Sequence, residues 1–334
     1  MAKRKTIATK RREALVQQKF EKRNDKNAPD WENVLDRQLQ EIGIAGGFCR
    51  LLTCDSTNDL LKSFSQRIIA KELEQTTRVV KPPTLRDNAE EWINRFMLPD
   101  ELPFVVAADE QTAGRGRQSN TWWTGQGSLA LSMLLDAKQY GLTPQVSAQL
   151  SLAIGYAAMQ ALRLITEETL HKSKSTTQTD TTGVDRSLPN IEIRWPNDVY
   201  VNDRKITGIL IEVPNMRHVV IGIGANTNNT VADAPEEIRD RIMTLSDVLG
   251  QRIDQSRFIF LLCREIMAIL QFFPSQTPQL VEQIERNLYQ VGKIVDISRE
   301  NERITGHCLG LNTDGSLRIL TETGEKAVVS GVML

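Results

Sequence analysis

The chain has 334 residues, of which 40% are hydrophobic and 25% charged, and its formal net charge at pH 7 is −1. This composition is typical of a globular protein, and the length predicts one large domain with a smaller one beside it. No run of eighteen apolar residues occurs, which excludes a transmembrane helix, and the basic first residues lack the apolar core of a secretory signal. We therefore expect a cytoplasmic protein.

The first 45 residues predict a basic arm that lies outside the folded domain. Nine Lys or Arg and two Glu occur in residues 1–23. The simplest interpretation is a solvated, flexible arm, and the alternative is a contact with nucleic acid or another acidic partner. No helix-turn-helix pattern is found before residue 50, so a role in binding nucleic acid is not favoured.

Cysteine and histidine are sparse and widely spaced. No C-x-x-C pair occurs, and the histidines match no metal-ligand spacing, which argues against a zinc site and against histidine-based catalysis. We expect reduced thiols, mostly in the core. The residues are Cys49, Cys54, Cys263, Cys308, His171, His218 and His307.

The first part of the main domain, which we place at residues 46–288, alternates strands and helices. Asp55, Ser56 and Thr57 offer N-cap side chains to a helix that follows directly on a strand. A glycine-rich loop separates two apolar strands. In chain order we expect a strand at 48–54, a helix at 56–69, a loop at 71–90, a short helix at 88–97, a strand at 103–109, the loop at 113–127 and a strand at 128–135.

The second part combines a buried helix with several closely spaced strands. Apolar residues at helical spacing predict a helix over 144–165, and a Ser/Thr-rich segment at 171–190 predicts a surface insertion. Strands in quick succession indicate hairpins and hence an antiparallel or mixed sheet. We expect strands at 191–195, 199–203, 208–213 and 218–225, then three helices within 244–288, the longest at about 256–273.

The last segment, 289–334, changes to alternating strands separated by turn residues such as Asp314-Gly315 and Thr323-Gly324. This pattern predicts a small all-β barrel. The fold class is therefore α+β, with a mixed or antiparallel sheet packed with helices and a C-terminal β-barrel domain.

Four short motifs carry groups suited to binding an anionic ligand. Glycines let a backbone approach an anion, and arginine supplies donor forks for phosphate. Each motif alone also fits a plain turn, hairpin or helix cap. The motifs are Asp55 to Asn58, Glu110 to Arg117, Arg194 to Asp198 followed by Lys205 and Gly208, and Gly222 to Asn226.

In the third of these motifs, Asp198 and Lys205 are predicted on neighbouring strands of one hairpin. Both side chains could therefore face one pocket, where the lysine would neutralise a carboxylate or phosphate. The carboxylate could orient an incoming amine or help to hold a metal.

Together and in this order, the motifs resemble those of biotin–protein ligases. That family carries D-S-T-N, E-Q-T-A-G-R-G-R-R-G, K-W-P-N-D with K-x-x-G-I-L-x-E, and G-I-G-x-N, and the resemblance covers about residues 47–334. It implies a fold shared with class II aminoacyl-tRNA synthetases and a C-terminal barrel similar to Src-homology-3 domains. It also implies formation of biotinyl-5′-AMP from biotin and ATP with Mg²⁺, then transfer of biotin to a lysine of a carboxylase carrier domain.

The resemblance assigns roles residue by residue. Lys205, Arg117 and Asp198 are implied to be catalytic. Biotin would be bound by Ser56, Thr57, Asn58, Gln111, Gly114, Arg115, Gly116, Arg117, Lys205, Gly208 and Leu210. The nucleotide would be bound by Arg115, Arg117, Trp122, Asn197, Lys205 and Asn226, with no metal ligand firmly assigned and Mg²⁺ carried by ATP near Asn197 and Asp198.

This sequence departs from the family pattern at two places inside the motifs. Gln118-Ser119 replaces R-G, which lowers the charge of the loop and removes a glycine, and Arg194 replaces the lysine before W-P-N-D. The DNA-binding domain of the family's regulatory members is not found either. Two alternatives stay open: a lipoate–protein ligase, and a protein that binds biotin or nucleic acid without turnover. The oligomeric state, including a homodimer, also stays open.

Overall fold

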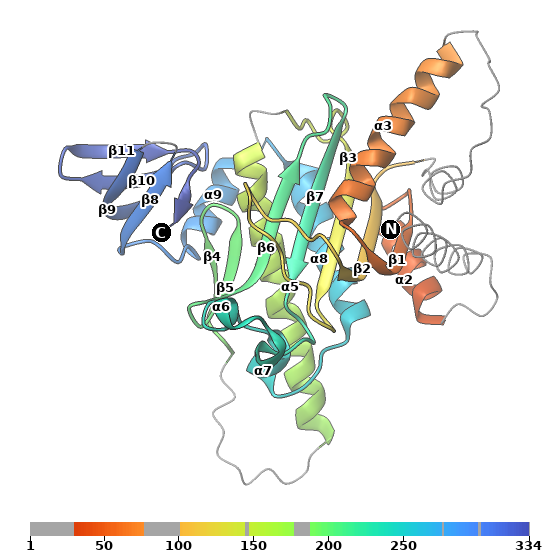
Figure 1. Cartoon of the computed structure of the whole chain (residues 1–334), viewed down its shortest axis with the longest axis horizontal. Helices are drawn as coiled ribbons and strands as arrows, with labels where there is room; N and C mark the ends of the chain where they lie inside the picture. Colours follow the sequence, from red (N-terminus) through yellow and green to blue (C-terminus); the bar gives the residue numbers. More distant parts are fainter. Residues whose placement is uncertain are drawn as a thin grey trace, which may run out of the picture.

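A seven-stranded sheet forms the centre of the molecule in the computed structural model, which describes residues 30–76, 101–143, 147–176, 188–275, 277–299 and 302–333. The strand order is β1-β2-β3-β7-β6-β5-β4 (Figure 1). β1 pairs with β2 in parallel and all other neighbours are antiparallel, so the sheet is mixed as predicted. The strands are β1 Phe48–Cys54, β2 Phe104–Gln111, β3 Leu129–Asp136, β4 Ile191–Arg194, β5 Asp198–Val201, β6 Arg204–Glu212 and β7 His218–Ala225.

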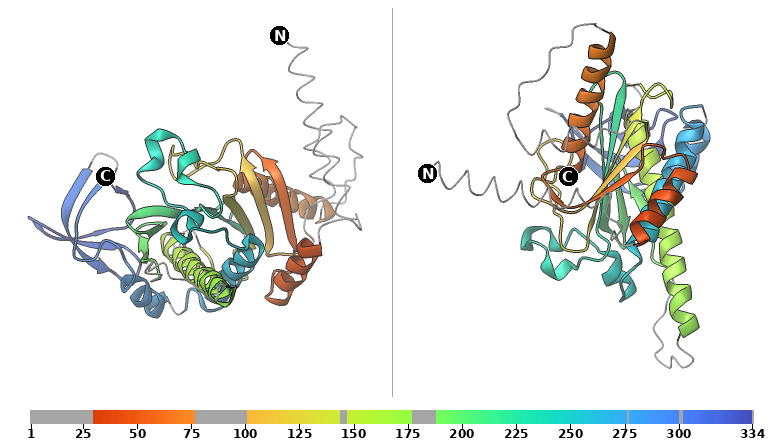
Figure 2. Two further views of the ribbon diagram at one scale, coloured as in Figure 1. Left: turned by 90° about the horizontal axis from the view of Figure 1, so that it is seen from below. Right: turned by 90° about the vertical axis from the view of Figure 1, so that its right-hand side faces the viewer.

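Helices cover both faces of the sheet because its central strands are apolar on both sides. Val105, Met133 and Ile221 belong to the main core, which includes α5 (Ser147–Thr176) and α8 (Gln255–Phe272). The alternate residues Val106 and Val220 pack with α3 (Thr57–Thr76) in a second, smaller cluster. In Figure 2, α3 lies on one side of the sheet, and α5 and α8 lie together on the other. This period-two alternation between two buried faces explains why the strands read as continuous apolar runs.

Helix α2 (Asp30–Glu41) falls within the segment predicted to be a flexible arm, and that prediction is wrong for these residues. Leu35 and Leu39 lie one helical turn apart and are fully buried in the main core. Asp36 accepts a 2.8 Å hydrogen bond from the backbone N–H of Phe48 at the start of β1. Because the preceding residues are highly charged, the sequence pattern did not indicate this short apolar stripe as part of a helix. Residues 1–29 lie outside the described residues.

Leu39→Ala is expected to lower the free energy of unfolding by about 2–5 kcal/mol, because it leaves a cavity in a fully buried site. Urea unfolding followed by fluorescence measures the change. Gln40→Ala is the matched control on the same helix, at an exposed residue, and should change stability by less than about 0.5 kcal/mol. Equal effects of the two variants would show that α2 is not part of the folded domain.

Two helices extend beyond their predicted ends. α3 continues to Thr76, into the predicted loop at 71–90, and α5 continues to Thr176, into the predicted insertion at 171–190. Neither extension contains glycine or proline, so nothing in it stops the helix. The predicted helix at 88–97 and the rest of the insertion, 177–187, lie outside the described residues.

The three helices predicted within 244–288 are confirmed as α7 (Leu245–Leu249), α8 and α9 (Thr277–Glu285). Asp254 caps α8 by accepting a hydrogen bond from the backbone N–H of Arg257. A 3₁₀ turn, Val231–Asp233, and a short helix α6, Glu236–Arg239, precede them.

The C-terminal segment forms a five-stranded antiparallel sheet beside β4 (Figure 1). Its order is β11-β10-β9-β8-β12, which confirms the predicted small all-β domain as an antiparallel sheet with β11 and β12 at its ends. The turn before β10 docks on the main domain, where the buried Trp195 indole donates a 3.1 Å hydrogen bond to the Gly315 carbonyl. The strands are β8 Ile294–Arg299, β9 Glu302–Leu311, β10 Leu317–Thr321, β11 Gly324–Val328 and β12 Val332–Met333.

In the part of the chain that the structure describes, no helix has the length and apolarity to cross a membrane.

Candidate active site

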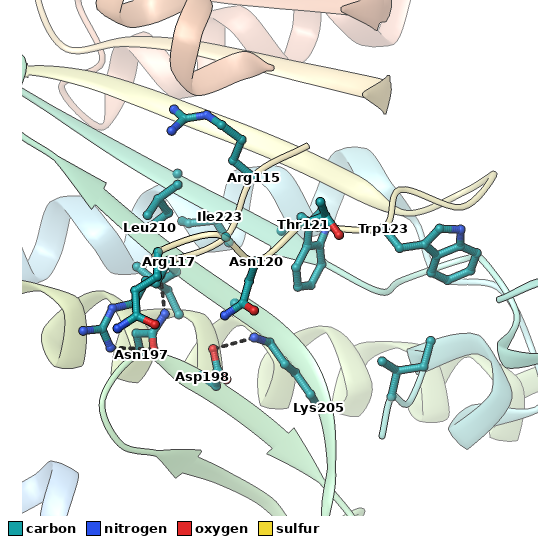
Figure 3. Close-up of a pocket in the computed structure, with 18 of the residues that line it drawn as sticks. Arg115, Arg117, Asn120, Thr121, Trp123, Asn197, Asp198, Lys205, Leu210 and Ile223 are labelled. Atoms are coloured by element: carbon teal, nitrogen blue, oxygen red, sulfur yellow. Dashed lines mark hydrogen bonds and ion pairs between the residues drawn. The ribbon is translucent and has the colours of Figure 1, made fainter. Parts of the chain in front are cut away.

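A cavity of about 470 Å³ opens on the α3 side of the sheet and collects the predicted site residues. Figure 3 shows part of its lining, which comes from the loop after β2 and from β5, β6 and β7. Every predicted site residue lines it except Gly114. Those that line it are Ser56, Thr57, Asn58, Gln111, Arg115, Gly116, Arg117, Trp122, Asn197, Asp198, Lys205, Gly208, Leu210 and Asn226.

Glycines on β6 and β7 make the floor of the cavity flat enough to hold large side chains. A Cβ on Gly224 would overlap the Trp122 indole, and one on Gly222 would overlap the Asn58 amide. Gly208 pairs with Gly224 across the two strands, and its Cβ would lie 3.1 Å from the same indole. The G-I-G glycines therefore admit two side chains of the site against the sheet, where direct approach of a ligand to the backbone was expected.

A polar network fixes the end of the cavity at the start of α3. Gln111 Oε1 accepts hydrogen bonds from the backbone N–H of Thr57, at 2.8 Å, and from its hydroxyl, at 3.1 Å. The buried Ser132 hydroxyl lies 2.7 Å from Thr57 Oγ1 and 2.6 Å from Asn58 Oδ1. These neutral donors and acceptors suit a polar, uncharged ligand head such as a ureido group.

The glycine-arginine loop is a tight hairpin. The Trp122 N–H donates to the Gly114 carbonyl at 3.0 Å, and the Gly116 N–H donates to the Asn120 carbonyl at 2.8 Å. Gly114 faces this hairpin, since a Cβ there would lie 2.5 Å from the Trp122 carbonyl oxygen. At the departure from the family pattern, Gln118 takes the left-handed conformation with φ of 56°. Ser119 does not, so the missing glycine causes no strain there.

The two arginines of the loop have different surroundings. Arg115 forms ion pairs with Asp59 at 2.8 Å and with Glu212 at 2.7 Å, and Figure 3 shows its guanidinium turned away from Lys205. Arg117 reaches Asn197, whose Oδ1 accepts a 3.3 Å hydrogen bond. Among the described residues, no carboxylate lies within ion-pair distance of Arg117. Burial lowers the pKa of Arg117, and the attraction of the Asp198 carboxylate offsets this only in part.

Asp198 and Lys205 meet in the cavity, as the predicted hairpin requires. A two-residue turn at Asn202 and Asp203, both with positive φ, joins β5 to β6. Lys205 Nζ lies 2.8 Å from Asp198 Oδ1 (Figure 3) and 5.6 Å from the centre of a Trp122 ring. The Lys205 ammonium therefore forms both an ion pair with a carboxylate and a cation–π contact with an aromatic ring.

Asn197 is hydrogen-bonded to the backbone, and Asn226 to a neighbouring side chain. Asn197 Nδ2 donates a 2.6 Å hydrogen bond to the Ile209 carbonyl, and Asn226 Oδ1 accepts one of 3.1 Å from Asn229. Asn226 is buried within the cavity wall. The other polar side-chain atom of Asn197, Oδ1, accepts the hydrogen bond from Arg117.

Known proteins are similar to this chain in the segments that form the cavity. The model of the biotin/lipoate A/B protein ligase family matches residues 88–226, which include the loop, the β5–β6 hairpin and the G-I-G strand. The solved structure of a biotin protein ligase from Aquifex aeolicus in complex with biotin and ATP aligns with a TM-score of 0.62 and 27% identity. That alignment covers 86% of this chain and 97% of the other. The chain belongs to the biotin/lipoate A/B protein ligase family.

Curated members of the family are similar at the sequence level. A bifunctional ligase/repressor BirA of Bacillus spizizenii is 30% identical over 233 residues, 68% of this chain and 64% of that protein. A biotin–[acetyl-CoA-carboxylase] ligase of Mycobacterium tuberculosis is 27% identical over 229 residues, 67% of this chain and 75% of that protein. The chain thus spans somewhat less than two thirds of the BirA protein.

Several lining residues of this family member were not predicted. Arg241, Ile238 and Ile242 come from the segment after β7, and Gly331 to Met333 come from the C-terminal sheet. No sequence motif marks either group, because each reaches the cavity through tertiary packing. Ser132 faces the cavity side of β3 opposite Gly222, a position that strand alternation alone could have indicated.

The described residues contain no group of three or more His, Cys, Asp or Glu side chains that could hold a metal ion. Asn197 and Asp198 supply one amide and one carboxylate oxygen to the cavity lining. This donor set fits Mg²⁺ bound mainly by nucleotide phosphates and not by a protein cage.

Proposed function

We propose that this chain is a biotin–protein ligase that forms biotinyl-5′-AMP from biotin and ATP and transfers biotin to a carrier lysine. The observation that carries the proposal is Arg117, a half-buried cation outside ion-pair distance of any described carboxylate, in the same cavity as Lys205. A half-buried guanidinium outside ion-pair distance of a carboxylate is stabilised by a bound anion, and adenylation brings two anions together.

In the first step, a carboxylate oxygen of biotin attacks the α-phosphorus of ATP, and the bond to the β-phosphate bridging oxygen breaks to release pyrophosphate. We assign Arg117 and Lys205 to the charge that develops on the phosphate oxygens. Thr57, Asn58 and Gln111 would orient the ureido head of biotin, and Trp122 would lie along the bound adenylate. Mg²⁺, as part of the nucleotide substrate, would neutralise phosphate charge near Asn197 and Asp198.

In the second step, the lysine amine of a biotin carboxyl carrier domain attacks the acyl carbon, loses a proton, and expels AMP. Asp198 is the carboxylate nearest to this reaction in our assignment, because its ion pair places it beside Lys205. It would orient the amine by accepting a hydrogen bond. The four free cysteines are typical of a reducing compartment, and we propose the cytoplasm as the location of the reaction.

One incubation tests the proposal. The protein is mixed with ATP, Mg²⁺, a carrier domain, and either biotin or lipoate, and the mass of the carrier lysine is measured. We expect addition of biotin. Addition of lipoate alone would assign the chain to the lipoate branch of the family. Absence of pyrophosphate release at saturating ATP and biotin would instead indicate a binding protein without turnover.

Arg117→Gly is expected to release biotinyl-AMP into solution about tenfold faster or more. A hydrogen bond to a charged group contributes about 1.5–3 kcal/mol, and this variant removes the loop's contact to the phosphate. Labelling of lysines on a bystander protein such as albumin measures the release.

Gln118→Gly is the matched control for Arg117→Gly. It increases backbone freedom in the same loop, at a residue whose φ is already 56°, but keeps the cation. Bystander labelling should stay near the wild-type level. Equal labelling by the two variants would mean that loop stiffness, and not the Arg117 charge, retains the adenylate.

A further inference from the structure

Glu212 lies at the centre of a charged cluster beside the cavity and has no role in the reaction steps above. Glu212, at the end of β6, accepts hydrogen bonds from Lys62, Asn58 and Arg115, at 2.8, 2.8 and 2.7 Å. Asp59, in the first turn of α3, accepts two more from Arg115, at 2.8 and 3.0 Å. Glu212 thus joins the loop, helix α3 and strand β6 at one point.

The charges of this cluster balance. Two carboxylates, Asp59 and Glu212, face two cations, Lys62 and Arg115. Burial on its own raises the pKa of Glu212, but its hydrogen bonds from Lys62, Asn58 and Arg115 outweigh burial and bring the pKa below its ordinary value. The carboxylate therefore stays ionised near neutral pH, and the positive charge of Arg115 is already neutralised in the folded protein.

Arg115 and Arg117 therefore have different roles in the loop. Arg115 is held on the α3 side by two carboxylates, whereas Arg117 points across the cavity to Asn197 (Figure 3). Resting on the proposed function, we propose that Asp59 and Glu212 are positioning residues that latch the loop through Arg115 and leave Arg117 as its phosphate-binding cation. The loop is then tethered at Arg115, and its opening movement begins beyond that residue.

This assignment changes the role that the family resemblance gave to Arg115. A guanidinium with two carboxylate partners has little remaining attraction for a third anion at short range. Arg115 acts in binding through the loop backbone that it fixes, and its neighbours Gly116 and Arg117 make the contacts with the ligand.

The test uses trypsin cleavage after Arg117, a residue that the test variants keep. The double variant Asp59→Asn, Glu212→Gln removes both negative charges but keeps polar side chains of nearly the same shape. Cleavage at this bond in the ligand-free protein should become about tenfold faster, because two charge-assisted contacts of Arg115 are lost. Quantitative mass spectrometry of the resulting fragments gives the rate.

Two controls separate a local latch from general destabilisation. Glu282→Gln removes an exposed carboxylate of α9 that pairs with Arg286, neither of which lines the cavity, and should leave the cleavage rate unchanged. The thermal midpoint of each variant shows whether the whole protein has loosened. Raising the salt concentration should speed cleavage of the wild type but not of the double variant, because screening weakens the same ion pairs.

The latch and the ligase activity can fail independently. An unchanged cleavage rate in the double variant overturns the latch, whether or not the protein forms biotinyl-AMP. Faster cleavage with no pyrophosphate release from the wild type supports the latch and rejects the proposed function. Faster cleavage together with faster loss of bound biotinyl-AMP supports both.

Discussion

Lys205→Ala should lower the rate of pyrophosphate release, with biotin and ATP saturating, by about 10²- to 10³-fold. This is the typical cost of removing one preorganised group that stabilises charge in a transition state. The loss has a second cause, since Asp198 stays in the cavity without its 2.8 Å ion-pair partner and repels the incoming phosphate. The binding of biotin alone should change much less, because its ureido head contacts other residues.

Two further variants test this explanation. Arg204→Ala removes the neighbouring cation on β6, which does not line the cavity, and should keep the wild-type rate. Adding Asp198→Asn to Lys205→Ala removes the unpaired carboxylate and should recover part of the pyrophosphate release while transfer to the carrier stays slow. An unchanged rate in Lys205→Ala would refute the role of this lysine.

The second large effect is expected from Gly224→Ala. The added methyl group would occupy the position of the Trp122 indole, which must leave the floor of the cavity. Forcing one extra carbon into a packed site costs about 1–3 kcal/mol, which corresponds to about 5- to 150-fold in affinity. We expect the Michaelis constant for ATP to rise by that factor, and the tryptophan emission of the free protein to shift.

Gly155→Ala is the control for this methyl group. Gly155 lies in α5, and the nearest atom to its added Cβ would be at 3.8 Å, which is ordinary contact. Alanine is also the better helix former, so stability should hold or rise. If Gly224→Ala binds ATP as tightly as Gly155→Ala does, Trp122 does not form part of the nucleotide site.

The sequence predicted those parts of the site that depend on neighbours along the chain. The β5–β6 hairpin was predicted from two closely spaced strands, and this was enough to bring Asp198 and Lys205 together. The turn itself lies at Asn202 and Asp203, which were predicted inside the first strand. The mixed sheet and the three late helices follow from apolar periodicity. These features need no knowledge of what lies across the fold.

The sequence did not predict what distant elements contribute. The partners of Arg115 come from α3 and from the end of β6, and Met333 reaches the cavity from the second sheet. Helix α2 was missed for a related reason. It is stabilised by burial of Leu35 and Leu39 against α8, whereas its sequence is mostly polar. These positions are determined by tertiary packing, which cannot be read from a local sequence pattern.

The strand order also determines when the site can exist during synthesis. β3 lies between β2 and β7, and its pairing of Leu129 with Ala225 joins residues far apart in the chain. A nascent chain that ends before β7 has no Gly224 floor, and β3 is paired only with β2, so the apolar surface along its other edge stays open to chaperones or aggregation. A growing polypeptide on the ribosome should therefore gain affinity for ligand late and abruptly, once the seventh strand has inserted.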